Sequence, residues 1–124
     1  MSSRSLIVEG YVRRPGVSQG NSDADSIVLK SATSQRGWRL ARILRERSGS
    51  SRLEEALQRI ESGETDGLIV AQLPDLGPSL REAVAAIDRI RAAGGTLLSV
   101  NDRVELGPNT GLPLWRLLVS LAEW

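Results

Sequence analysis

The alternation of short apolar runs with capped amphipathic segments is the feature that most constrains the fold of this chain. Residues 68–70 (Leu-Ile-Val) form a continuous apolar run within residues 66–73, and such runs are typical of buried parallel strands. Residues 79–82 (Ser-Leu-Arg-Glu) form a capping box, and the apolar residues after it recur at helical spacing until two glycines stop the pattern. Residues 96–100 predict the next strand. Strands that alternate with helices predict an α/β domain with a mainly parallel sheet of four or five strands flanked by helices.

The first part of the chain continues this alternation. Residues 5–11 contain an apolar run and predict the first strand. Residues 16–25 are rich in Ser, Gly, Asn and Asp, a composition that indicates a loop. We expect a helix within residues 22–36, with Ser22 or Asp23 as its N-cap and a glycine as its stop.

Residues 38–45 fit two structures. Their leucine and isoleucine spacing fits a helix, whereas the short run that starts directly after Gly37 fits a strand. Residues 51–54 (Ser-Arg-Leu-Glu) form another capping box, and Gly63 ends the helix that it opens. Leucines at helical spacing then predict a last helix, with Pro113 near its first turn: Leu114, Leu117, Leu118 and Leu121.

The loops after the strands are the expected place for function, because ligands of parallel α/β sheets bind beyond the carboxyl ends of the strands. These loops are residues 11–19, 45–52, 73–79 and 101–109.

Composition excludes several kinds of chemistry. The 124 residues include no cysteine and no histidine, so disulfides, thiolate nucleophiles and imidazole catalysis are ruled out, and only carboxylates remain as zinc ligands. We therefore expect no metal and no cofactor. A net charge of +1 is not typical of a domain that binds DNA strongly by itself. The early apolar run at 6–8 is too short for a signal peptide or a membrane span, so we expect a cytoplasmic, single-domain protein with no membrane partner.

Short motifs occur in order along nearly the whole chain: Tyr11-Val12-Arg13, Arg36-Gly37-Trp38, Ser48-Gly49-Ser50-Ser51-Arg52, residues 73–79 (Leu-Pro-Asp-Leu-Gly-Pro-Ser), and Thr110-Gly111 followed by Leu121-Ala122-Glu123-Trp124. This ordered set resembles the catalytic domain of serine recombinases of the resolvase/invertase type. The resemblance implies that residues 1–124 form one resolvase-like domain that ends in the start of a long final helix. It also implies that residues 40–45 form the second strand.

The resemblance implies a specific chemistry and shows where this chain departs from it. In the family, a serine hydroxyl attacks a DNA phosphodiester and arginines neutralise the phosphate. Arg13 matches the first active-site arginine, whereas Pro15 stands at the position of the nucleophile. In the family's Leu-Asp-Arg-Leu-Gly-Arg-Ser motif, Pro74 replaces the aspartate, and Asp75 and Pro78 replace the two arginines.

The roles of three remaining candidate residues, Ser18, Arg52 and Arg13, stay open. If residues 14–16 are an insertion, Ser18 takes the place of the missing nucleophile. Arg52 either matches the arginine of the family's Ser-Gly loop or is a plain residue of the first helical turn. Arg13 is either a phosphate ligand or a structural ion-pair partner.

The expected function is that of a catalytically silent module, not an enzyme, that works by protein–protein contact. Its partner is a second copy of the chain, bound through an apolar face of the final helix: Leu114, Leu117, Leu118, Leu121 and Trp124. DNA is a partner only through an additional DNA-binding domain. The first alternative is an active recombinase domain taken from a longer protein, with Ser18 as nucleophile. The second is an unrelated doubly wound domain with a small-molecule or regulatory role.

Overall fold

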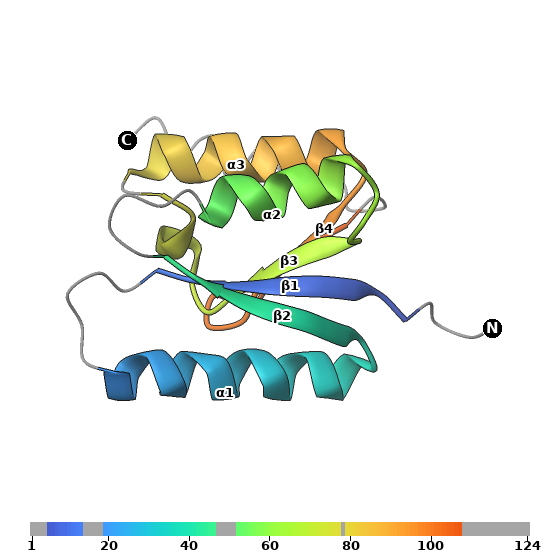
Figure 1. Cartoon of the computed structure of the whole chain (residues 1–124). Coiled ribbons are helices and arrows are strands. Elements are labelled where there is room, and N and C mark those ends of the chain that lie inside the picture. Colours follow the sequence, from blue (N-terminus) through green and yellow to red (C-terminus); the bar gives the residue numbers. More distant parts are fainter. Residues whose placement is uncertain (1–4, 14–18, 47–51, 78, 108–124) are drawn as a thin grey trace.

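A computed structural model describes residues 5–13, 19–46, 52–77 and 79–107, and the fold below refers to these residues. The elements follow in the order β1 (Ile7–Val12), α1 (Gln19–Arg36), β2 (Arg39–Arg45), α2 (Arg52–Glu61), β3 (Gly67–Val70), the 3-10 helix η1 (Leu73–Leu76), α3 (Leu80–Ala92), β4 (Thr96–Ser99) and β5 (Val104–Leu106). Figure 1 shows a central sheet with α1 on one face and α2 and α3 on the other.

The sheet confirms the predicted fold class. Its strands lie in the order β2-β1-β3-β4-β5, and every neighbouring pair is parallel except β4 and β5. The antiparallel β5 was not expected, because residues 101–109 were predicted to be a loop. A tight turn after β4 returns the chain beside that strand, where Leu106 pairs with Leu97 and its side chain is buried.

The core lies in two layers, one on each face of the sheet. Leu68 and Leu97 pack on the side of α2 and α3, whereas Ile69 and Leu98 pack on the side of α1 together with Leu29. This division follows from the two-residue period of a strand, which sends successive side chains to opposite faces. All residues of β3 and β4 are buried, as the continuous apolar runs predicted.

The start of α1 corrects the sequence prediction. The helix begins at Gln19, so part of the expected loop at 16–25 is helical, and Ser22 and Asp23 lie inside the helix rather than at its cap. Ser, Asn and Asp are weak helix formers, but such propensities are small and yield to packing. Here Leu29 and Ala32, further along the same helix, are buried against the sheet.

The other local predictions that fall on described residues are confirmed. Residues 39–45 are a strand, parallel to β1 at one edge of the sheet. The Ser79 hydroxyl accepts a hydrogen bond from the Glu82 backbone N–H at 3.2 Å and donates one to the Glu82 carboxylate at 3.2 Å. Gly37 and Gly63 follow helix ends with φ of +70° and +84°. Ser51 and the expected final helix lie outside the described residues.

No helix in the described part of the chain is long and apolar enough to cross a membrane.

Candidate functional site

The candidate site lies at the carboxyl edge of the sheet, where the ends of four parallel strands meet. Backbone hydrogen bonds extend beyond the strands at this edge: the Glu46 N–H donates to the Val12 carbonyl at 2.9 Å, and the Val100 N–H donates to the Val70 carbonyl at 3.0 Å. The segments that follow β1, β2, β3 and β4 are therefore neighbours, as the predicted topology requires.

Tyr11 joins the ends of β1 and β2. Its side chain is fully buried, and its hydroxyl donates a hydrogen bond to Glu46 Oε1 at 2.6 Å. Burial raises the pKa of the Tyr11 hydroxyl far above its ordinary value, and the hydrogen bond to Glu46 raises it further. The charge of Arg13 acts to lower this pKa and that of Asp75 to raise it, so both groups lie within electrostatic reach of Tyr11. Tyr11 is consequently a neutral donor that orients the Glu46 carboxylate.

Arg13 follows β1, is half-buried, and lines a groove formed with residues of α2, η1 and α3. The groove has a volume of about 340 Å³, and Leu53, Leu57 and Leu76 contribute its apolar surface. Arg89 also lines the groove, and hydrogen bonds to Glu54 engage its guanidinium. No hydrogen bond or ion pair engages the Arg13 guanidinium within the described part of the chain, so this group is available to an anion. Neither interpretation of Arg13 is decided by these contacts, and a phosphate-binding role stays a prediction.

The segment after β3 forms η1, in which Pro74 is exposed and Asp75 is buried. Pro74 is exposed in the first turn of η1, where its missing N–H costs nothing. Asp75 is only 3% exposed, and its Oδ1 accepts a hydrogen bond from Gln72 Nε2 at 3.5 Å. The Asp75 carboxylate therefore lies beneath the edge rather than on its surface.

Asp102 was not singled out from the sequence, although it falls in one of the expected loops. Its Oδ2 accepts hydrogen bonds from the Leu73 backbone N–H and from the Ser99 hydroxyl, both at 2.7 Å. One carboxylate thus connects η1 to the end of β4. The only sequence signal was its place in an Asn-Asp pair directly after a predicted strand.

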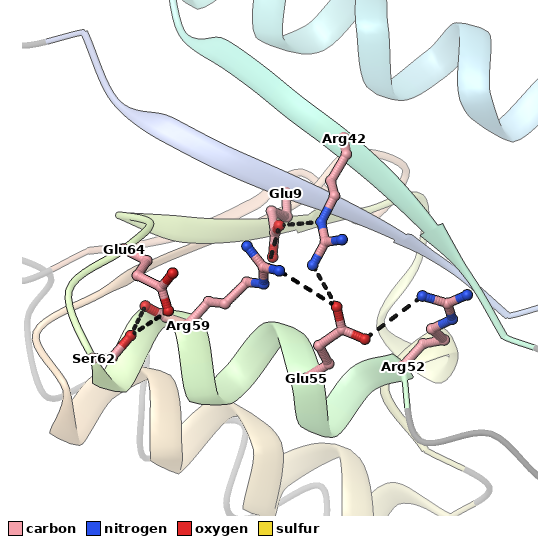
Figure 2. Close-up of polar contacts among 7 residues, drawn as sticks. All are labelled: Glu9, Arg42, Arg52, Glu55, Arg59, Ser62 and Glu64. Atoms are coloured by element: carbon pink, nitrogen blue, oxygen red, sulfur yellow. Dashed lines mark hydrogen bonds and ion pairs between the residues drawn. The ribbon is translucent and has the colours of Figure 1, made fainter.

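Arg52 contributes to a separate ion-pair cluster between α2 and the sheet. Its Nη1 lies 3.6 Å from Glu55, which also pairs with Arg42 and Arg59. Figure 2 shows these side chains gathered around Glu55, with Glu9 of β1 contacting Arg42 from the sheet. The first-turn reading of Arg52 agrees with this placement, because Arg52 opens α2 and pairs with the residue three positions later.

Glu9 is the least exposed member of that cluster. Its carboxylate is 1% exposed and accepts a hydrogen bond from Arg42 Nε at 2.6 Å, while Arg59 Nε lies 3.8 Å away. The Arg42 hydrogen bond holds the pKa of Glu55 below its usual range, and the hydrogen bonds to Glu9 and Glu55 raise the pKa of Arg42. The cluster connects β1, β2 and α2 and is a structural feature rather than part of the edge.

The other predicted residues lie outside the described part of the chain. These are Ser18, Pro15, Pro78 and the proposed interface residues Leu114, Leu117, Leu118, Leu121 and Trp124. The described residues also contain no group of three or more Asp or Glu side chains that could hold a metal ion.

Comparisons with known proteins agree with this architecture. The resolvase N-terminal domain family matches residues 8–124. The N-terminal catalytic domain of TP901-1 integrase superposes with a TM-score of 0.76 at 20% identity, over 94% of both chains. A resolvase family site-specific recombinase from Streptococcus pneumoniae has a TM-score of 0.79 at 15% identity, over 96% of this chain and 87% of that one. The catalytic domain of ISC1926 TnpA, an IS607-like serine recombinase, has a TM-score of 0.67 at 13% identity, over 94% and 79% of the two chains.

No curated protein sequence matches the chain. The family match nevertheless covers almost its whole length, and the fold superposes on the matched structures with TM-scores of 0.67 to 0.79. The chain therefore belongs to the resolvase N-terminal domain family and has the fold of a serine recombinase catalytic domain. The alternative of an unrelated doubly wound domain is excluded.

Proposed function

We propose that this domain does not cleave DNA and instead acts as an oligomerising or regulatory module of a recombinase-type assembly. The observation that carries the proposal is the position of Asp75, a buried carboxylate where the family motif has its first arginine. The described part of the edge adds two further carboxylates, Glu46 and Asp102, each of which accepts hydrogen bonds from groups at the edge.

This charge distribution opposes phosphate chemistry. A unit charge about 4 Å from a phosphate changes the interaction by roughly 4 kcal/mol at an effective dielectric constant of about 20. A tenfold change in rate corresponds to only about 1.4 kcal/mol. The exchange removes the positive charge of the arginine from the edge, and the loss of that one charge corresponds to about three powers of ten in rate. Pro15, which has no hydroxyl, stands at the aligned nucleophile position.

One observation favours the alternative of an active domain with Ser18 as nucleophile. The Arg13 guanidinium is uncommitted and borders a groove, as a phosphate ligand would be. The alternative therefore retains one arginine, but it requires Ser18 to replace the aligned residue.

The deciding experiment fuses the chain to a DNA-binding domain of known specificity and incubates it with supercoiled DNA that carries matching sites. We expect neither a covalent protein–DNA adduct nor recombinant product, from the natural chain or from Pro15→Ser. Pro15→Ser should stay inactive because groups that act as a unit fail together. An adduct that forms with the natural chain and disappears in Ser18→Ala would overturn the proposal and establish Ser18 as nucleophile. The same fusion carrying an active serine recombinase domain is the positive control.

A further inference from the structure

Within the described residues, one helix, α1, lies on its face of the sheet (Figure 1). A helix with its side chains is about 10 Å wide and neighbouring strands are about 4.8 Å apart, so one helix covers about two strands. The helix α1 packs against β1 and β2. The strands β4 and β5 lie at the other edge of the sheet, and the end of α1 reaches β5 through the ion pair of Arg36 with Glu105.

A cavity of about 430 Å³ lies on this face of the sheet, between α1 and the β4–β5 hairpin. Its apolar surface comes from Ala32 of α1 and from Leu98 and Val100 at the end of β4. Its polar surface comes from Gln35, Arg36, Arg103 and Glu105. Small-molecule sites have volumes of about 300–1,000 Å³ and combine apolar walls with a few polar groups, so the cavity has the size and composition of such a site.

The charges around this cavity do not cancel. Arg36 Nε lies 3.1 Å from Glu105 Oε1, and the same guanidinium lies 5.6 Å from the centre of the Trp38 ring. That pair is neutral as a whole. The guanidinium of Arg103 makes no hydrogen bond or ion pair with any residue that the structure describes. One positive charge at the cavity is therefore left uncompensated, and an anion would complement it.

The backbone of Arg103 supports a role for its side chain. Its φ of 55° lies in the left-handed region, which glycine adopts freely and which arginine adopts at a cost. The Arg103 N–H donates to the Val100 carbonyl at 3.2 Å and so closes the turn. Glycine would meet the needs of this turn more easily, yet the position carries a long cation that lines the cavity.

We infer that this cavity binds a small organic anion, whose carboxylate or phosphate pairs with Arg103 and whose apolar part lies on Leu98 and Val100. The site is on the opposite face of the sheet from the groove beside Arg13, and it is independent of whether the domain cleaves DNA. It would allow a metabolite-sized ligand to stabilise the β4–β5 hairpin.

The test is a titration of the full, isotopically labelled chain followed by amide chemical shifts. The probes are phenyl phosphate, benzoate and inorganic phosphate. We expect saturable shifts at Ala32, Val100 and Arg103 with phenyl phosphate or benzoate, which distinguishes a phosphate from a carboxylate preference. Inorganic phosphate should bind about tenfold more weakly, because it cannot bury apolar surface. If neither aromatic anion gives saturable shifts at these residues, the inference is wrong.

Variants separate binding from folding. Arg103→Gly removes the guanidinium and suits the left-handed backbone, so the protein should stay folded while affinity falls about tenfold, the usual effect of losing one charge-assisted hydrogen bond. Arg81→Gln removes an exposed arginine of α3 and should bind like the natural chain. Equal affinity of the Arg103→Gly and Arg81→Gln variants would overturn the inference.

Discussion

Asp75 occupies a position of the family motif and is also a buried residue of the fold, and the sequence alone does not reveal its burial. It stands at a motif position that bears arginine in active relatives, and it is buried in η1 beside Gln72. A buried carboxylate is costly unless it is hydrogen-bonded, and the Gln72 amide donates to Asp75 Oδ1 at 3.5 Å. An arginine at this position would either be buried in the interior or have to extend out to the surface of the edge.

We expect Asp75→Arg to lower the free energy of unfolding by about 3 kcal/mol, because it forces a larger charged side chain into a position that is only 3% exposed. Pro74→Arg is the matched control, since Pro74 is exposed in the same turn, and it should cost no more than about 1 kcal/mol. Urea unfolding followed by tryptophan fluorescence measures both. If the two variants lose equal stability, burial of this position is not the cause of the loss.

Gly67 is required by the close approach of two strands. A Cβ at this position would lie 2.2 Å from the Thr96 carbonyl oxygen, a backbone atom that cannot move aside. We expect Gly67→Ala to destabilise the domain by about 1–3 kcal/mol through overpacking. Gly107→Ala is the control, because its added Cβ would meet the nearest heavy atom at 3.5 Å. Thermal unfolding should show a lower Tm for Gly67→Ala alone, and equal Tm values would contradict the steric argument.

At the scale of the elements, Arg89 of α3 provides ion pairs between α3 and α2. Arg89 of α3 donates hydrogen bonds to both carboxylate oxygens of Glu54, at 2.6 and 2.9 Å, and to both of Glu61, at 3.0 and 2.9 Å. These hydrogen bonds hold the pKa of Glu54 and the pKa of Glu61 below their ordinary value of 4.5. They also raise the pKa of Arg89, which stays charged at every pH of interest. The pair of helices therefore has a pH-dependent contact on its surface.

This contact predicts a specific pH dependence. Because folding lowers the pKa of both glutamates, their contribution to stability is present above the ordinary pKa and is lost as the pH falls through the lower folded value. We expect Arg89→Gln to lower Tm by about 3 °C at pH 7, with the difference from the natural chain shrinking as the pH falls below the ordinary glutamate pKa of 4.5. Arg81→Gln on the same helix should change Tm little at neutral or acidic pH. A difference that does not shrink in acid would show that Arg89 acts through packing instead.

The elements differ in how far local pattern determined them. The strand at 39–45 fitted a helix equally well by spacing, and its strand state came from the family resemblance rather than from its own residues. The 3-10 helix η1 had no signal beyond a proline and an aspartate. The strand β5 has only three residues, and its conformation depends on pairing with β4 rather than on any period of its own.

At the scale of the whole molecule, the proposed function requires self-association through the final segment. We expect the full chain to sediment as a dimer, and the double variant Leu117→Glu/Leu121→Glu to sediment as a monomer, because charges in an apolar interface are costly. Ile27→Glu is the control, since Ile27 is 66% exposed on α1 and lies away from that segment in the sequence. A natural chain that stays monomeric at high concentration would contradict the prediction. Dissociation caused by Ile27→Glu would place the interface on α1 instead.

The sequence by itself determined the α/β class, the parallel strands at 67–70 and 96–99, the capping box at Ser79 and the edge at which the motifs meet. Each of these features depends on interactions between residues close in the chain or on the regular spacing of apolar residues. It can therefore be derived from the amino-acid sequence. The position of Arg13 directly after a strand end was also predicted, whereas its role as a phosphate ligand stays a prediction.

Only the tertiary structure decided what the side chains at that edge do. The burial of Asp75, the hydrogen bond of Tyr11 to Glu46 and the bridge from Asp102 to Leu73 join segments that are far apart in the chain. The early start of α1 has the same origin, since packing of its later residues on the sheet outweighs weak local propensity. Burial and pairing depend on which strands become neighbours, and that arrangement is a property of the folded sheet rather than of any one segment.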